Sequence, residues 1–294
     1  MPRCVFLTLA DRGNFVIDDE LAYPALAQRG FDVEAIPWND PHVDWNDFDI
    51  VVIRSTWDYQ SQPDKFLAAL AAIENSSALL ANSHAIAKWN LQKTYLARLQ
   101  QDGVDIVPSL FGGALAGGEL PSIFDRLDCD EIVIKPQVSH TAQGAFRLQR
   151  DTAADRAVEV ERYYLDTAYL AQPMVRSIVT EGEYSLFYFN GEYSHAISKR
   201  PKPGDFRSQE EHGSDILPAT ADAALRAAGR AAVDAVKEPL LYARADFVRS
   251  NFDDNYWLME LELIEPALYF RMDPQSPQRF ALALTDWLER YTRK

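Results

Sequence analysis

Residues 258–269 read LMELELIEPALY, a run that places three glutamates in an otherwise apolar segment. On an extended chain Glu260 and Glu262 lie two residues apart and therefore point to the same face. Glu265 stands directly before Pro266, where a strand is expected to end. Two unit charges ~4 Å apart repel by about 4 kcal/mol at an effective dielectric constant near 20. The carboxyl groups therefore need raised pKa values or cations among them.

The preceding apolar run carries Arg244 and Asp246, and the polar residues 249–255 predict a turn that joins the two runs as a hairpin. In this hairpin Asp246 faces Glu260 or its neighbour. Asp246, Glu260 and Glu262 would then form an oxygen-rich patch, which is the donor set that Mg²⁺ shares with substrate phosphates. The alternative is a cross-strand ion pair between Arg244 and Glu262 on a solvated face.

Composition bounds the class of protein. The chain has 294 residues, of which 47% are hydrophobic, and this predicts a large core divided into two or three domains. Its net charge of -15 argues against nucleic acid or an anionic membrane as the main partner. Cys4 and Cys129 are too few for a disulfide framework or a thiolate metal site. The opening run, residues 4–10, is too short for a signal peptide or membrane span, so we expect a cytoplasmic protein.

The first third of the chain alternates short apolar runs with amphipathic segments, which is the pattern of a doubly wound parallel sheet. The apolar run 50–53 passes directly into polar and aromatic residues. Ligands of such sheets bind beyond the carboxyl ends of the strands. This position makes the following residues a candidate substrate surface: Arg54, Trp57, Asp58 and Tyr59. An ordinary polar loop, with Trp57 as a core residue, is the alternative interpretation.

Two lysines are candidates for holding phosphate. Residues 83–103 predict one helix that ends at Gly103 and carries Lys93, which by itself is typical of a solvated helix face. Lys135 closes the apolar run 132–134, and its charge has to be met by a partner, of which a phosphate is one kind. The loop after it offers hydroxyl and backbone N–H groups at Ser139, Thr141 and Gly144. The sequence contains neither GxxxxGK[ST] nor GxGxxG, which argues against P-loop and dinucleotide-binding folds.

A hairpin is predicted around Asn190-Gly191, the strongest turn signal in the chain. A two-residue turn places Glu183 opposite Ser198. The open end continues into a basic loop with two prolines, and its cations are Lys199, Arg200, Lys202 and Arg207. Such a loop is typical of a lid over an anionic substrate, and a surface loop that balances local charge is the alternative.

In this order the segments resemble the ATP-grasp superfamily, and within it the glutathione-synthetase-like ligases, over about residues 88–270. The resemblance implies an α/β (α+β) protein with the ATP-grasp fold. Residues 1–88 would form a doubly wound parallel-sheet pre-ATP-grasp domain that binds substrate. Residues 89–174 would form a small central domain with the lysines and the phosphate loop. Residues 175–294 would form an antiparallel-sheet domain with the metal-binding strands and the basic loop.

The resemblance also implies site residues and cofactors. ATP would be held by Lys93, Lys135, Ser139, Thr141, Gly144, Gln172, Met174, Val175 and Glu183. One or two Mg²⁺ ions, with Mn²⁺ as an alternative, would be held by Asp246, Glu260 and Glu262. Lys199 and Arg207 would act at the substrate and the γ-phosphate, and Arg244 and Glu265 would contact substrate. Glu262 replaces the usual Asn, and Glu265-Pro266 replaces a Ser-Pro.

The activity that the resemblance implies is activation of an amino acid-like carboxylate as an acyl phosphate, followed by attack of a nitrogen nucleophile and release of ADP and phosphate. Ligation of two molecules is the commonest such activity. "RSTWDY", "KRPKPGDFR" and "ELIEP" are most similar to the O-ureido-serine cyclo-ligases of cycloserine biosynthesis, so ring closure is the second hypothesis. A nucleotide-binding module without turnover is the third. Ligases of this class are often homodimers, and neither nucleic acid nor a membrane is expected as a partner.

Overall fold

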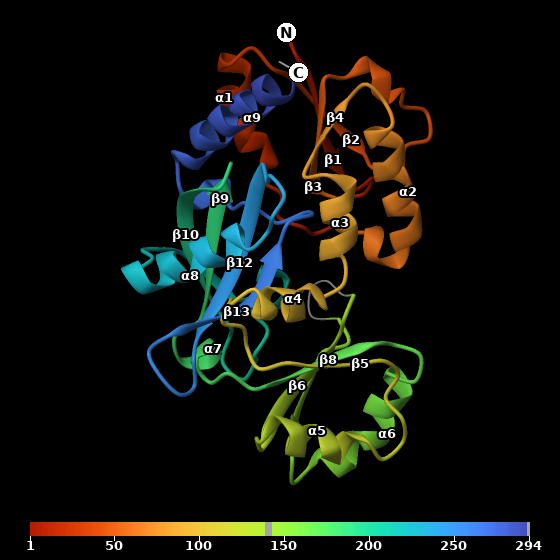
Figure 1. Cartoon of the computed structure of the whole chain (residues 1–294), viewed down its shortest axis with the longest axis vertical. Coiled ribbons are helices and arrows are strands. Elements are labelled where there is room, and N and C mark those ends of the chain that lie inside the picture. The colour runs from red at the N-terminus through yellow and green to blue at the C-terminus, as the bar shows by residue number, and fades with distance from the viewer. Residues whose placement is uncertain (139–142, 293–294) are drawn as a thin grey trace.

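The computed structural model describes residues 1–138 and 143–292, which form three β-sheets flanked by helices (Figure 1). Ser139 and Thr141 of the predicted phosphate loop lie outside the described residues. The strands of each sheet fall within one of the three segments expected from the sequence. The boundaries at residues 88 and 174 themselves stay a prediction.

The N-terminal sheet is parallel and has the order β2-β1-β3-β4. Its strands are β1 (Arg3–Thr8), β2 (Asp32–Pro37), β3 (Ile50–Ser55) and β4 (Leu79–Ala81). Helices α1 (Tyr23–Gln28) and α9 (Ser276–Thr292) pack on the face that carries Phe6 and Val52, whereas α2 (Pro63–Glu74) packs on the face that carries Val51. Every residue of β3 is buried, as a strand covered on both faces requires. The predicted doubly wound sheet is confirmed.

The central sheet is antiparallel, with the order β5-β8-β6-β7. Its strands are β5 (Leu110–Gly112), β6 (Glu131–Pro136), β7 (Phe146–Gln149) and β8 (Tyr169–Pro173). Ile132 and Ile134 of β6 pack under helices α5 (Leu120–Leu127) and α6 (Ala153–Tyr163). Because side chains alternate along a strand, Val133 and Lys135 point to the opposite face, where they line a cavity.

The C-terminal sheet is antiparallel, with the order β11-β10-β9-β12-β13. Its strands are β9 (Glu183–Phe189), β10 (Glu192–Arg200), β11 (Asp215–Ala219), β12 (Tyr242–Arg249) and β13 (Tyr256–Glu262), and α7 (Ser177–Thr180) precedes them. Helix α8 (Ala223–Asp234) covers the face that carries Ala243 and Ala245. The alternate residues Arg244 and Asp246 therefore face the cavity on the other side. In the described part of the chain, no helix has the length and apolarity needed to span a bilayer.

Asn82 joins the N-terminal sheet to the C-terminal sheet. Its backbone is left-handed, with φ of 47°, and its side chain is fully buried. The amide nitrogen donates to the carbonyls of Tyr242 (2.9 Å) and Leu263 (2.7 Å), and the amide oxygen accepts from the N–H of Leu241 at 2.8 Å. The ends of β12 and β13 are thereby fixed beside β4.

The prediction of a single helix over residues 83–103 is wrong. The segment forms two helices, α3 (His84–Asn90) and α4 (Tyr95–Gln101), and Lys93 lies in the break between them. The backbone N–H of Lys93 donates to the carbonyl of Gln137, at 2.9 Å, instead of continuing the helical ladder. The Asn90 side chain also bonds to β13 and the residue after it, at the carbonyl of Leu261 (2.8 Å) and the N–H of Leu263 (2.9 Å). These tertiary bonds stop the helix and turn Lys93 toward the cavity.

The hairpin of β9 and β10 has the predicted two-residue turn at Asn190-Gly191, but the predicted register at its open end is wrong. A β-bulge between Tyr193 and His195 shifts the pairing by one residue. Glu183 is therefore opposite Lys199, not Ser198. The bulge therefore brings Glu183 and Lys199, two residues of the predicted site, into direct contact.

Candidate active site

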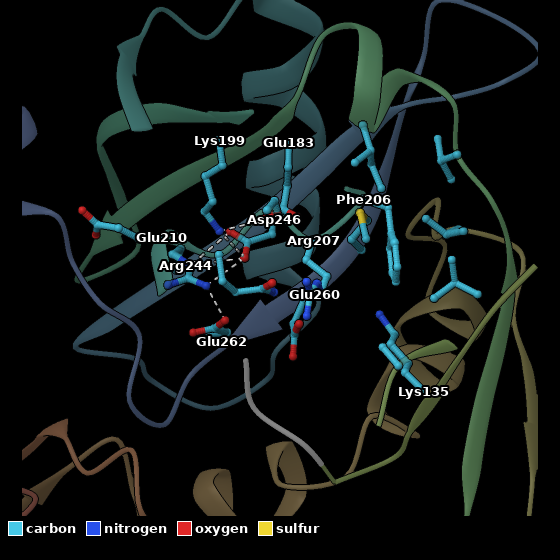
Figure 2. Close-up of a pocket in the computed structure, with 18 of the residues that line it drawn as sticks. Lys135, Glu183, Lys199, Phe206, Arg207, Glu210, Arg244, Asp246, Glu260 and Glu262 are labelled. Atoms are coloured by element: carbon cyan, nitrogen blue, oxygen red, sulfur yellow. Dashed lines mark hydrogen bonds and ion pairs between the residues drawn. The ribbon is translucent and has the colours of Figure 1, made fainter. Parts of the chain in front are cut away.

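One cavity lies between the central and C-terminal sheets, and residues of the N-terminal domain complete its wall (Figure 2). Its wall receives side chains from all three parts of the chain. The residues predicted as functional that line it are Lys93, Lys135, Gln172, Met174, Val175, Glu183, Lys199, Arg207, Arg244, Asp246, Glu260, Glu262 and Trp57. Distant segments thus converge as the sequence predicted, although the role of each residue stays a prediction.

The acidic hairpin has the expected register, with Asp246 opposite Glu260 and Arg244 opposite Glu262. The alternative cross-strand ion pair is also present: Arg244 contacts Glu262 and lies 2.9 Å from Asp246. Its predicted setting on a solvated face is wrong, because the side chain of Arg244 is only 9% exposed and that of Glu262 is 23% exposed. Both side chains line the cavity instead.

Lys199 occupies the centre of the acidic group. Its Nζ lies 2.7 Å from Oε1 of Glu183 and 3.2 Å from Oδ2 of Asp246. Burial alone would raise the pKa of Asp246, but the positive charges of Arg244 and Lys199 outweigh it and hold that pKa well below its usual range. Burial and the nearby Arg244 act to lower the pKa of Lys199, yet the two carboxylates raise it above its usual value.

The two candidate phosphate-binding lysines differ in their contacts. Lys93 Nζ lies 3.0 Å from Oε1 of Glu260. Within the described residues, the ammonium group of Lys135 forms neither a hydrogen bond nor an ion pair, and Figure 2 shows it across the cavity from the acids. Burial lowers the pKa of Lys135, an effect that Glu260 only partly opposes. Lys135 is thus a cation in the cavity wall with no direct ion pair to an anion, which is the property expected of a phosphate site.

The carboxyl groups of Glu262 and Glu265 have raised pKa values, because nearby cations do not offset the effect of burial. Burial, opposed by Arg244, raises the pKa of Glu262 to about 7. Burial, with the charge of Glu262 added, raises the pKa of Glu265 to about 8. Burial also acts on Glu260, but Lys93 and Lys135 outweigh it and lower that pKa.

Asp246, Glu260 and Glu262 are the side chains expected to hold a metal ion. Over residues 1–138 and 143–292, no three His, Cys, Asp or Glu side chains form a ready metal cluster. The carboxylates instead contact Lys93, Lys199 and Arg244. Asp246, Glu260 and Glu262 nevertheless supply hard oxygen atoms from neighbouring strands to one cavity. These residues fit Mg²⁺ by chemistry.

The end of the cavity beside β8 is apolar. Met174 and Val175 were predicted there, and the sequence reasoning missed Val107, Ile178, Phe206 and Met259. Strict alternation along the strand would turn Met259 away from the face of Glu260, and the bulge that leaves Met259 unpaired between Leu258 and Glu260 carries no signal in the sequence. Val16 was also missed, and its loop after β1 carries no pattern that points to a site.

The basic loop over the cavity is held by its own acid. Arg207 donates to both carboxylate oxygens of Asp205, with contacts of 2.8 and 3.0 Å among them. The side-chain hydrogen bond from Arg207 holds the pKa of Asp205 well below its usual range. Ser208 Oγ donates to Oε2 of Glu183 at 2.6 Å. The loop is therefore tied to the same carboxylate that contacts Lys199.

Most of the predicted substrate residues of the N-terminal domain lie behind the cavity wall. Arg54 is 1% exposed, forms an ion pair with Asp19 at 2.9 Å and donates to the carbonyl of Pro266 at 2.8 Å. Asp58 accepts from the indole N–H of Trp38 at 2.7 Å. Tyr59 stacks on Phe66, with ring centroids 4.2 Å apart. Of this group only Trp57 lines the cavity, because the side chains of the other three are engaged in these contacts instead.

Glu265 and Gly144 also lie outside the lining. The carbonyl of Glu265 accepts from the indole N–H of Trp57 at 2.8 Å, so it supports the one N-terminal aromatic that does line it. Gly144 has φ of +73°, and a Cβ there would clash with the hydroxyl of Tyr163. Its neighbour Ala145 lines the cavity. Only glycine fits this close turn.

The comparisons with known proteins identify the family. Residues 4–82 match the family model described as the N-terminal domain of D-cycloserine synthetase DcsG. The chain is 30% identical over 275 residues to the cycloserine biosynthesis protein DcsG of Streptomyces lavendulae, covering 88% of this chain and 90% of that protein. This chain belongs to the DcsG family.

Solved structures agree with the DcsG assignment. The crystal structure of D-cycloserine synthetase DcsG matches with a TM-score of 0.85 and 28% identity, covering 97% of this chain and 99% of that one. D-alanine–D-alanine ligase from Bacillus anthracis (TM-score 0.65, 14% identity, 100% and 99% covered) and the ATP-grasp ligase PsnB (0.65, 15%, 98% and 98%) share the fold. The predicted ATP-grasp fold, the ligase class and the likeness to the cycloserine cyclo-ligases are confirmed.

Proposed function

We propose that this DcsG-family ligase uses ATP to activate the carboxylate of an amino acid-like substrate, and that a nitrogen of the same molecule then closes a ring. One observation carries the proposal: Lys135 and Glu260, from two different sheets, line the same cavity. The sequence alone put ligation of two molecules first. We put ring closure first here. Similarity to a cycloserine biosynthesis protein and to the crystal structure of a D-cycloserine synthetase supports this order.

Different residues of the cavity would bind the nucleoside and the phosphates of ATP. The apolar residues around Met174 and Val175 would enclose adenine, and Glu183 would accept hydrogen bonds from the ribose. The ammonium groups of Lys93 and Lys135 would neutralise phosphate oxygens, and Lys135 needs no existing ion pair to be broken. Asp246, Glu260 and Glu262 would hold Mg²⁺, and the ion when bound would neutralise charge on the β- and γ-phosphates.

The chemistry follows from charge placement. A carboxylate oxygen of the substrate attacks the γ-phosphorus, the bond to the β-phosphate oxygen breaks, and ADP leaves. The substrate nitrogen then attacks the acyl carbon, the C–N bond forms, inorganic phosphate leaves and the nitrogen loses a proton. Arg207, Lys199 and Arg244 line the cavity as cations that would stabilise the negative charge in both steps. Trp57 would form the wall on the side of the organic substrate.

The test is ADP release with Mg²⁺ across a panel of amino acids and their ureido and hydroxamate derivatives. Turnover with a single organic compound, such as O-ureido-serine, supports ring closure. An absolute need for a second, amine-bearing compound would instead establish ligation between two molecules. Thermal stabilisation by ATP without ADP release across the whole panel would leave only a nucleotide-binding module. The expected homodimer and the number of metal ions are proposals that light scattering and metal titration can test.

A further inference from the structure

A half-buried arginine outside the cavity wall connects two loops that each contribute to that wall. Arg271, in the short 3-10 helix Phe270–Met272, places Nη1 3.1 Å from Oδ2 of Asp18 and Nη2 2.5 Å from Oε2 of Glu210. Its backbone N–H donates to the same Asp18 oxygen at 3.2 Å. Arg271 itself does not line the cavity, whereas Glu210 does.

Asp18 ends the loop that follows β1. Two residues earlier in that loop, Val16 lines the cavity although it is 49% exposed, and Phe15 packs edge-on against Trp57 with ring centroids 5.2 Å apart. The Asp18 carboxyl is only 9% exposed, and burial raises its pKa while Arg271 lowers it. Without Arg271 this carboxyl would lose its positive partner in a buried position.

Glu210 belongs to the basic loop, residues 201–214, in which Ser208 donates to Glu183 of β9 and Ser214 donates to the carbonyl of Arg207 within the loop. The guanidinium carbon of Arg271 also lies 4.7 Å from the ring centroid of Tyr269. Tyr269 lines the cavity in a left-handed conformation, with φ of 49°, which is unfavourable for a bulky side chain and needs support from its surroundings. Three parts of the cavity wall therefore meet at one side chain.

We infer that Arg271 is a positioning residue: it clasps the loop after β1 to the basic loop and so closes the substrate end of the cavity. This role rests on the proposed ligase function, since it assigns that end to the organic substrate. ATP lies at the other end, beside β8. Loss of the clasp therefore weakens use of the organic substrate more than use of ATP.

Limited digestion with trypsin measures the clasp without any turnover. Lys202 precedes Pro203 and Arg200 precedes Pro201, so the only cleavable bond within residues 201–214 is Arg207–Ser208. Arg271→Gln should be cut there about tenfold faster than the parent, as loss of charge-assisted hydrogen bonds predicts. Arg271→Lys should stay within about threefold, because it keeps the positive charge. Glu210→Gln, which removes only the loop side of the clasp, should also be cut faster.

Arg249→Gln is the matched control, because the Arg249–Glu181 pair has similar exposure (26% and 37%, against 24% and 31% for Arg271–Glu210) and lies outside the cavity wall. It should leave cleavage after Arg207 unchanged. Equal cleavage of Arg271→Gln and the parent would overturn the clasp. That result is independent of the proposed function, which fails separately if the parent releases no ADP.

Kinetics distinguish a positioning role from general destabilisation. For Arg271→Gln, kcat/KM for the organic substrate should fall about tenfold while KM for ATP changes less than about twofold. Arg271→Lys should recover most of the loss. An equal rise of both KM values, or a change in neither, would contradict the inference.

Discussion

Lys199 lies opposite Glu183 in the β9–β10 pair, and its ammonium group contacts both Glu183 at 2.7 Å and Asp246 at 3.2 Å. The three side chains are 8% exposed or less. The positive charge therefore holds two buried carboxylates that would otherwise repel each other. Its first role is to make the acidic strand compatible with a folded protein.

Lys199→Met should lower the free energy of unfolding by about 3–5 kcal/mol, because it leaves two buried carboxylates without this partner. Urea denaturation measures the loss. Lys199→Met combined with Glu183→Gln should be more stable than the single changes predict by addition, with a coupling of about 1 kcal/mol or more. Arg230→Gln, which breaks the exposed Arg230–Asp234 pair, is the control and should leave stability unchanged. Simple additivity would show that the ammonium group does not bridge the acids.

Lys135→Met should weaken ATP binding about 10- to 100-fold, as loss of a charge-assisted contact to phosphate predicts. Its stability should be unchanged or higher, because Lys135 has no ion pair among the described residues and burial disfavours its charge. Isothermal titration with ATP and urea denaturation check the two statements. Lys237→Met, on an exposed lysine, is the control. Unaltered ATP affinity would remove Lys135 from the nucleotide site.

The sequence predicted much of this arrangement because alternation along a strand determines which side chains share a face. Asp246 and Glu260 pair as expected, although a bulge between Asp246 and Phe247 shifts the register by one residue before this pair. The register predicted for Glu183 was wrong because a bulge adds one residue to β10. Nothing in the sequence pattern of β10 indicates this bulge. Interactions between residues far apart in the sequence could not be predicted either. The backbone N–H of Lys93 donates to the carbonyl of Gln137 instead of to a carbonyl of its own helix, and Arg54 forms an ion pair with Asp19 instead of lining the cavity.

Asn82→Ala should lower the free energy of unfolding by about 3 kcal/mol, because three hydrogen bonds to buried backbone groups are lost together. Asn82→Asp should be no better, since a carboxylate cannot donate to the carbonyls of Tyr242 and Leu263. Asn46, which is exposed, provides the control Asn46→Ala. Thermal unfolding measures all three. A small loss for Asn82→Ala would show that the two sheets are held together chiefly by their apolar contacts.

Glu265 should make stability depend on pH. Its ordinary pKa is near 4.5, and burial together with Glu262 raises it to about 8 in the folded chain. Between these values the native state binds a proton that the unfolded chain has released. The free energy of unfolding therefore falls as pH rises through this window, and the contribution of Glu265 is complete below pH 4.5 and lost above about pH 8.

Glu265→Gln mimics the protonated side chain and cannot ionise. Relative to the parent, it should gain about 2 kcal/mol of stability between pH 5 and pH 8, less than the full shift implies because the side chain is partly open to solvent. Urea titrations at both pH values provide the measurement. Glu211→Gln, on an exposed side chain, should show the same difference from the parent at both. If the difference for Glu265→Gln were also constant, the carboxyl would be ionised throughout, and a cation beside it would have to be sought.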